Sequence, residues 1–183
     1  MDDQLAERIP EIQLIGDQEL REKVLSVWKE ALNLGGWELS DLDEIPFTLL
    51  ISHCPVSYLG HVRAVTRTAV EAAKVMNSAY GDVISINMDH LVAGGLLHDI
   101  GKLLEYQRQG DRTVKSPLGE LLRHPFTGVA LSFKHGLPDE VTHIIALHAR
   151  EGEGARRSVE AIIITHADFL NYESLKVSVE TSP

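Results

Sequence analysis

Residues 94–102 read Gly-Gly-Leu-Leu-His-Asp-Ile-Gly-Lys, and this stretch decides how the rest of the chain is interpreted. Its adjacent His98 and Asp99 can bind one metal ion through an imidazole nitrogen and a carboxylate oxygen, and the carboxylate can bridge two ions. Further histidines and one aspartate lie on either side of the pair. The candidate ligand set is His61, His98, Asp99, His124, His148 and Asp168.

Four of these candidates fall on the faces of predicted helices that should be buried. In a helix over 138–149, His148 lies seven residues after Val141 on the apolar face. The same pattern places His61 in a helix over 61–79, His98 in a helix over 88–99 and Asp168 in a helix over 156–170. A lone histidine on such a face is more often hydrogen-bonded to a core carbonyl. Four such placements in one chain favour a metal site instead. The aspartate adds to this, because a buried aspartate is costly unless a cation accompanies it.

The remaining histidines do not share this placement, and we expect none of them to bind a metal directly. They are His53, His90, His135, His143 and His166. His166 flanks the face that carries Asp168, so it is the nearest of the five to the predicted site.

The composition predicts an ordinary globular chain whose negative charge is concentrated near its start. The 183 residues are 44% hydrophobic and carry a formal net charge of −10. Residues 1–60 hold 12 acidic and 4 basic side chains, while the rest of the chain is nearly balanced. Without a broad basic stripe, binding of extended nucleic acid is disfavoured. A few local cations can still hold a small phosphorylated molecule.

The sequence carries no targeting or membrane signal that we recognise. The start, MDDQLAERIPEI, is acidic and lacks the layout of a signal peptide. No apolar stretch approaches the length of a membrane span. The single cysteine, Cys54, cannot form an internal disulfide, and we interpret it as structural. These features predict a cytoplasmic protein that does not contact the membrane.

The chain is predicted to be all-α, with three parts. An N-terminal helical extension covers 1–57, a core domain covers 58–172 and a tail covers 173–183. A helix over 17–34 is expected to cap the core, and the tail is expected to fray or to dock on a neighbour. Further helices are expected at 116–122 and 125–135. Residues 105–115 are interpreted as a polar connection, and 83–86 are the best candidate for a strand.

The motifs resemble those of the HD-domain superfamily of metal-dependent phosphohydrolases over about residues 58–172. The core pattern of that superfamily is a histidine, then His-Asp, then a distant aspartate. The HDIGK form is more specific than a bare His-Asp pair. The segments HPFTG at 124–128, IIALH at 144–148 and THADF at 165–169 resemble motifs of its dinuclear branch.

The resemblance implies a helical bundle with one or two divalent metal ions per chain. One ion would be held by His61, His98, Asp99 and Asp168. In dinuclear members Asp99 would bridge to a second ion held by His124 and His148. The resemblance does not distinguish between iron, manganese, zinc, magnesium, nickel and cobalt.

Branches within the superfamily differ in how well they fit. Cyclic-di-GMP phosphodiesterases have a paired histidine and a Gly-Tyr-Pro signature, whereas Ala149 follows His148 here and REGEGARR stands at 150–157. Diadenosine tetraphosphate hydrolases share the six-ligand pattern. A membrane-anchored endoribonuclease shares HDIGK and the His-Pro segment. Residues 1–60 match neither, so the substrate stays open.

The expected activity is hydrolysis of a phosphoester or phosphoanhydride in a small nucleotide or other phosphorylated metabolite by a metal-activated hydroxide. Asp99 and Lys102 are the predicted catalytic residues. Cations near the ligands would bind the substrate phosphate. The side chains predicted to bind the phosphate are Lys102, Arg123, Arg150 and Arg156. The 150–157 loop is the expected lid over the substrate.

Three other functions are compatible with the same ligands. A diiron oxygenase of the same fold uses the same pattern and would consume oxygen. A nucleotide-sensing module would bind tightly without forming product. A nuclease is disfavoured by charge, and cleavage of short oligoribonucleotides would revive it.

Overall fold

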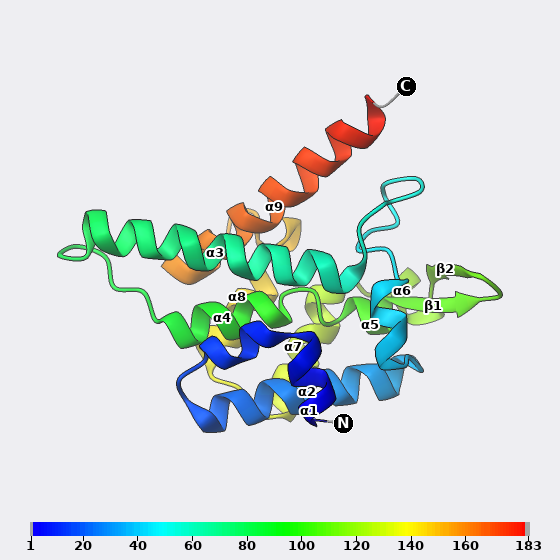
Figure 1. Cartoon of the computed structure of the whole chain (residues 1–183), viewed down its shortest axis with the longest axis horizontal. Helices are drawn as coiled ribbons and strands as arrows, with labels where there is room; N and C mark the ends of the chain where they lie inside the picture. The colour runs from blue at the N-terminus through cyan, green and yellow to red at the C-terminus, as the bar shows by residue number, and fades with distance from the viewer. Residues whose placement is uncertain (1, 182–183) are drawn as a thin grey trace.

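The computed structural model describes residues 2–181, and most of them are helical (Figure 1). The elements are α1 (Asp2–Arg8), η1 (Pro10–Leu14), α2 (Gln18–Gly35), η2 (Leu39–Asp43), α3 (Tyr58–Tyr80), α4 (Met88–Leu97), α5 (Lys102–Glu105), β1 (Tyr106–Gln109), β2 (Arg112–Lys115), α6 (Pro117–Leu121), α7 (His124–Lys134), α8 (Asp139–Leu147), η3 (Arg150–Gly152) and α9 (Val159–Glu180). The prediction of a helical fold is confirmed. Among these helices, none is long and apolar enough to cross a membrane.

Helix α4 lies at the centre of the fold. Residues 91–97 are buried on every side, and the helix packs against α2, α3, α8 and α9. Its glycine pair allows the close approach. A Cβ on Gly94 would lie 2.7 Å from the Ile144 side chain of α8, and one on Gly95 would lie 2.9 Å from Thr66 Oγ1 of α3. The pair therefore places the end of α4 between two neighbouring helices.

Side-chain caps fix where the site-bearing helices begin. Ser57, Asn87 and Ser158 each accept a hydrogen bond from the backbone N–H three residues later, at the starts of α3, α4 and α9. Such caps satisfy N–H groups that have no partner within the helix. The register of each helix relative to its predicted ligand is thus set locally.

The N-terminal segment packs on the core and shares its apolar cluster. The carboxylate of Asp89 accepts hydrogen bonds from the backbone of Gly16 and Asp17, at 2.8 and 2.9 Å. The indole of Trp37 donates to the Leu103 carbonyl at 2.8 Å. These contacts hold residues before 58 against the elements on both sides of the HDIGK turn.

The structure differs from the sequence-based expectation in three segments. Residues 106–115, expected as a polar connection, form an antiparallel hairpin with Tyr106 opposite Lys115. Its two-residue turn begins at Gly110, which has a φ of 60°. Residues 83–86 are not a strand. Helix α9 continues through Glu180, so residues 173–180 of the tail that was expected to fray or dock are helical, and the end of α9 extends away from the rest of the molecule (Figure 1). Residues 182–183 of that tail lie outside the described residues.

Candidate metal centre

The six predicted ligands come from helix ends and turns that meet beside α4. His61 lies in the first turn of α3, His98 caps the end of α4, Asp99 follows it, His124 begins α7, His148 caps the end of α8 and Asp168 lies within α9. Helix ends suit this purpose because side chains there can turn towards a shared centre while the helices pack side by side.

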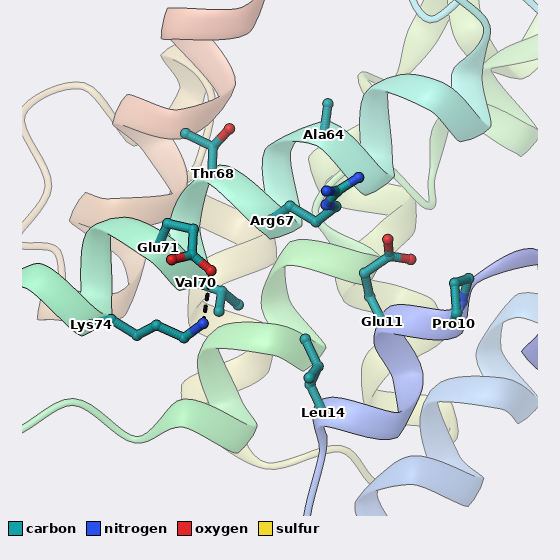
Figure 2. A pocket seen from close by; sticks show the side chains of 9 residues that line it. All are labelled: Pro10, Glu11, Leu14, Ala64, Arg67, Thr68, Val70, Glu71 and Lys74. Atoms are coloured by element: carbon teal, nitrogen blue, oxygen red, sulfur yellow. Dashed lines mark hydrogen bonds and ion pairs between the residues drawn. The ribbon is translucent and has the colours of Figure 1, made fainter.

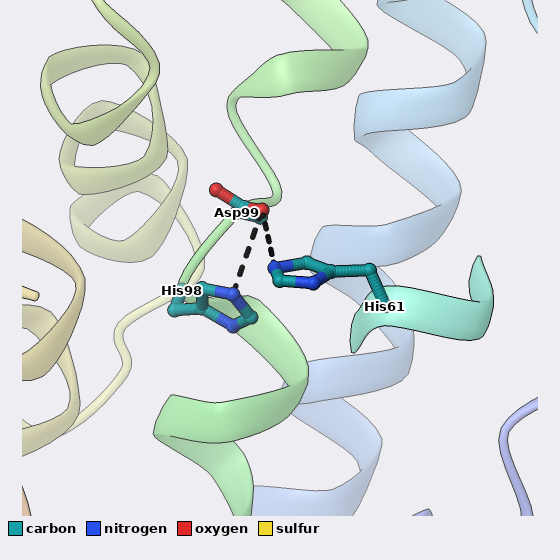
Figure 3. A group of neighbouring side chains, drawn as sticks. All are labelled: His61, His98 and Asp99. Atoms are coloured by element: carbon teal, nitrogen blue, oxygen red, sulfur yellow. Dashed lines mark ion pairs between the residues drawn. The ribbon is translucent and has the colours of Figure 1, made fainter. Parts of the chain in front are cut away.

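Five of the six form two groups that share Asp99. The first group is His61, His98 and Asp99, and the second group is Asp99, His124 and His148. Within each group the potential ligand atoms all lie within 4.8 Å of one another, and every member is buried. Figure 3 shows the two imidazoles of the first group turned towards the Asp99 carboxylate.

The two oxygens of Asp99 face different histidine pairs. Oδ2 lies 3.5 Å from Nε2 of both His61 and His98. Oδ1 lies 3.2 Å from Nε2 of His124 and 3.7 Å from Nε2 of His148. This is the arrangement that a carboxylate bridging two metal ions requires.

Asp168 adds a carboxylate beside the first group. Its Oδ1 lies 3.0 Å from His61 Nε2. Burial raises the pKa of Asp168, but its close contact with His61 outweighs burial and lowers that pKa to about 2. Asp168 is therefore an anion at neutral pH, as a metal ligand must be.

Hydrogen bonds fix the tautomers of three imidazoles. Nδ1 of His98 lies 2.7 Å from the Gly95 carbonyl, and Nδ1 of His148 lies 2.9 Å from the Ile145 carbonyl. Nδ1 of His124 lies 3.0 Å from a Glu105 oxygen. These oxygens only accept, so each Nδ1 carries the proton and each neutral ring keeps a lone pair on Nε2.

Burial favours the neutral form of His98 and of His124, and several imidazole Nε2 atoms in the site lack suitable partners. It lowers the pKa of His98 to about 4 and also lowers that of His124. Among the described residues, Nε2 of His61 and of His98 has no hydrogen-bond partner. Nε2 of His124 and Nε2 of His148 face each other at 3.2 Å. A cation among these lone pairs and carboxylates resolves both features, so the residues fit divalent metal ions.

Lys102 adds a positive charge directly beside the shared carboxylate. Its Nζ donates to Asp99 Oδ2 at 2.6 Å and to the Phe47 carbonyl at 2.7 Å. Burial raises the pKa of Asp99, but the charge of Lys102 outweighs burial and holds that pKa well below its usual range. The ring of Phe47 stacks on His61 at 4.2 Å, so this residue contacts both the lysine and a candidate ligand.

The turn after Asp99 lies directly against the start of α7. A Cβ on Gly101 would lie 2.1 Å from the His124 carbonyl, which no side chain could tolerate. Glu105, only 2% exposed, accepts from the His124 backbone N–H at 2.7 Å and from Arg123 at 3.3 Å. Arg123 also donates to Glu151 at 3.1 Å.

A cavity of about 530 Å³ opens onto the shared carboxylate. Asp99, Lys102, His124 and Asp168 are among its lining residues. Its aromatic walls are Phe47, Tyr106, Phe169 and Tyr172. Its other cations are Lys115, Arg123, Arg150 and Lys176. The cavity thus combines the candidate metal centre, positive charge and flat apolar surfaces, as a small-molecule site requires.

The predicted substrate cations differ in their placement. Lys102, Arg123 and Arg150 line the cavity, whereas Arg156 is exposed and is not among its lining residues. The neighbouring Arg157 donates to the carbonyls of Leu147 and Ala149, which ties the 150–157 loop to the end of α8.

Sequence reasoning missed Phe47, Glu105 and Lys115. Phe47 lies in the N-terminal segment, far from any motif, and Glu105 and Lys115 lie in the segment interpreted as a polar connection. Only the placement of Glu105 shortly after HDIGK could have drawn attention to it.

A second, larger cavity lies between η1 and α3, away from the metal groups (Figure 2). Its volume is about 930 Å³, and its nine lining residues include none of the six predicted ligands. Two of its charged side chains, Glu71 and Lys74, already pair at 2.7 Å. We place the functional site at the smaller cavity because it reaches the buried histidines and aspartates.

Comparisons with known proteins agree with this geometry. A dihydroneopterin 2′,3′-cyclic phosphate phosphodiesterase from Methanocaldococcus jannaschii is 33% identical over 159 residues, which are 84% of this chain and 63% of that protein. Ribonuclease Y from Mesoplasma florum is 31% identical over 103 residues, 56% of this chain and 18% of the ribonuclease. Ribonuclease Y from Thermosipho melanesiensis is 32% identical over 88 residues, 48% of this chain and 14% of the ribonuclease.

The chain thus spans less than two thirds of the length of each of these relatives. No solved structure matches it significantly. The profile of the HD domain matches residues 58–172, which is more than half of the chain. The family resemblance expected from HDIGK is thereby confirmed, and the chain belongs to the HD-domain phosphohydrolase superfamily.

Proposed function

We propose that this chain is a metal-dependent phosphodiesterase that opens the 2′,3′-cyclic phosphate of a small metabolite. One observation carries the proposal: the two oxygens of Asp99 face two separate histidine pairs beside a cavity of about 530 Å³. The name of the Methanocaldococcus relative supports the cyclic phosphate as the bond that is cleaved.

The reaction adds water across one P–O bond of the ring. The water oxygen bonds to phosphorus, and the bond from phosphorus to one of the two ester oxygens of the ring breaks. That ester oxygen takes a proton, so the product is a phosphomonoester. Divalent metal ions held by the two groups would lower the pKa of water and neutralise charge on the phosphoryl oxygens. Asp99 and Asp168, whose pKa values are lowered, are the anions that would hold those ions beside the imidazoles.

Two cations are proposed to bind the phosphate. Lys102 uses two of its three donors on Asp99 and the Phe47 carbonyl, which leaves one for a phosphate oxygen. Arg150 lines the cavity, and its guanidinium has no partner among the described residues. Arg123 is engaged by Glu105 and Glu151, so we assign it to holding the site together. The proposal assigns no substrate contact to the exposed Arg156.

The aromatic walls favour a substrate with a flat ring. Phe47, Tyr106, Phe169 and Tyr172 line the cavity and offer ring faces and edges for stacking. The cavity volume also falls in the range of small-molecule sites, which is roughly 300–1,000 Å³. A nucleoside or a pterin carrying a cyclic phosphate has this combination of features.

RNA is a weaker candidate than a small molecule. The matches to Ribonuclease Y cover 56% and 48% of this chain, and the net charge of −10 would repel a polyphosphate backbone. We therefore propose a small phosphorylated substrate and no extended nucleic acid.

The test is a product assay with protein loaded separately with manganese, iron, zinc or magnesium. The substrates are dihydroneopterin 2′,3′-cyclic phosphate, 2′,3′-cyclic AMP and a short oligoribonucleotide, and phosphorus NMR follows the products. We expect the cyclic phosphates to give phosphomonoesters, and a chelator to stop the reaction.

Three results would contradict the proposal. Cleavage of the oligonucleotide alone would indicate a nuclease. Oxygen consumption by the reduced, iron-loaded protein without hydrolysis would indicate an oxygenase. Tight binding of cyclic phosphates without product under any metal would indicate a sensing module.

A further inference from the structure

The second group has a buried acidic support that sequence reasoning did not find. Glu105 ends α5 and is 2% exposed, although it carries a carboxylate. Burying such a group is costly unless its oxygens are hydrogen-bonded. The hydrogen bonds that its two oxygens accept therefore decide how the cost of this burial is offset.

Both oxygens of Glu105 are directed at the start of α7. Oε2 accepts from the backbone N–H of His124 at 2.7 Å and from Nδ1 of the same residue at 3.0 Å. Oε1 accepts from Arg123 at 3.3 Å. One carboxylate thus holds both the main chain and the ring of a candidate ligand.

The other tautomers depend on main-chain oxygens. The Nδ1 atoms of His98 and His148 donate to the carbonyls of Gly95 and Ile145, three residues earlier in each chain segment. Those acceptors belong to the helices themselves. His124 begins its helix and has no preceding turn to supply a carbonyl, so a side chain from another element supplies the acceptor.

We propose that Glu105 is a positioning residue that orients His124 and fixes its proton on Nδ1, so that Nε2 is presented to a metal ion in the second group. The inference rests on the metal centre of the proposed function. A carboxylate behind a ligating imidazole fixes the ring and strengthens it as a ligand. Arg123 keeps this carboxylate in place, because it donates to Oε1 and is itself tied to Glu151.

The first experiment measures metal affinity. Manganese or zinc is titrated calorimetrically into the metal-free full chain and into its Glu105→Gln variant. Glutamine keeps the shape of the side chain, but its amide has a single acceptor oxygen, so either His124 or Arg123 loses its partner. We expect one of the two equivalents of metal ion to bind about 10- to 100-fold more weakly than to the unchanged chain, and the other to bind with unchanged affinity.

Glu120→Gln is the matched control. Glu120 is exposed and belongs to neither metal-binding group, so the same chemical change is made away from His124. We expect both equivalents to bind as in the unchanged chain. Weakening of both equivalents by Glu105→Gln to the same extent, or of neither, would overturn the inference.

The second experiment needs neither metal nor substrate. Nitrogen-15 NMR of the ring of His124 in the metal-free protein reports which nitrogen carries the proton. We expect a single tautomer protonated on Nδ1 in the unchanged chain and a mixture in Glu105→Gln. The same single tautomer in both proteins would contradict the inference.

These readouts separate the inference from the proposed function. If no cyclic phosphate is hydrolysed but the tautomer and one equivalent both depend on Glu105, the function fails and the inference stands. Circular dichroism melting of each variant checks folding. If Glu105→Gln unfolds, Arg123→Gln provides a second variant, since it removes a donor to Glu105 without altering either group, and a mixed tautomer of His124 is again expected.

Discussion

The two candidate metal-binding groups each contain a histidine held in the same way, but they differ in what surrounds it. His98 and His148 each end a helix, each is fully buried, and each donates from Nδ1 to the carbonyl three residues earlier. The groups differ in the role of a nearby carboxylate. Asp168 lies 3.0 Å from Nε2 of His61 and can itself bind a metal ion. Glu105 contacts Nδ1 of His124, on the far side of the ring from the second group.

The difference implies that the two groups are supported by different parts of the chain. The first group rests on Phe47 of the N-terminal segment, whose ring stacks on His61, and on Asp168 of α9. The second group rests on Glu105, which follows the HDIGK turn. Changes to either support should therefore affect one group and spare the other, while a change to Asp99 should affect both.

The largest effect is expected for Asp99→Ala. This substitution removes the carboxylate whose two oxygens face the two histidine pairs, so we expect loss of both metal ions and of all measurable turnover. Elemental analysis after dialysis and the cyclic phosphate assay measure the two losses. Asp111→Ala, at the exposed turn of the hairpin, is the control and should retain both ions. Retention of two ions by Asp99→Ala would show that the carboxylate is not shared.

A smaller effect is expected for the paired variants His98→Ala and His148→Ala. Each removes one imidazole from one group, so we expect each variant to keep one metal ion per chain and to lose most of its turnover. His166→Ala is the control, because His166 is exposed and belongs to neither group. If either variant lost both ions, the two groups would not bind metal ions independently of each other.

Phe47→Ala should lower stability and weaken the first group. Phe47 is 1% exposed, and truncation of a buried phenylalanine costs about 3–5 kcal/mol in free energy of unfolding. Urea unfolding measures this loss. Phe133→Ala is the control, since Phe133 is 67% exposed and should change stability by less than about 0.5 kcal/mol. We expect the metal equivalent bound through His61 to weaken. Equal weakening of both equivalents would mean that Phe47 does not act on the first group alone.

The fold was largely predictable because apolar periodicity and capping residues are local signals. The glycine pair before His98 and the buried spacing of His148 and Asp168 predicted helices that the structure contains. The hairpin at 106–115 was not predictable in this way, because its strands are short and polar. The strand expected at 83–86 failed for a related reason, since a brief β-branched run has no partner strand there.

The candidate site was predictable only where a motif marks it. The groups around Asp99 include His61, His98 and His148, which the sequence placed on buried helix faces. Glu105 lies 19 residues before His124, and Phe47 lies 14 residues before His61, so neither pairing leaves a periodic signal. Arginine placement was equally hidden, because Arg123, Arg150 and Arg156 look alike in the sequence and only packing separates Arg150 from Arg156.

The smallest predicted effect tests that last distinction. Arg150 lines the cavity, and Arg156 is exposed outside it, although the two lie on the same loop. We expect Arg150→Ala to raise the KM for a cyclic phosphate about fivefold, because an exposed cation contributes modestly to binding an anion, and to leave both metal equivalents in place. Steady-state kinetics at low and high salt measure the change, which should shrink as salt screens the charge. Arg156→Ala is the matched control and should leave KM unchanged. Equal effects of the two substitutions would mean that the loop acts through its overall charge, and that neither arginine contacts the phosphate directly.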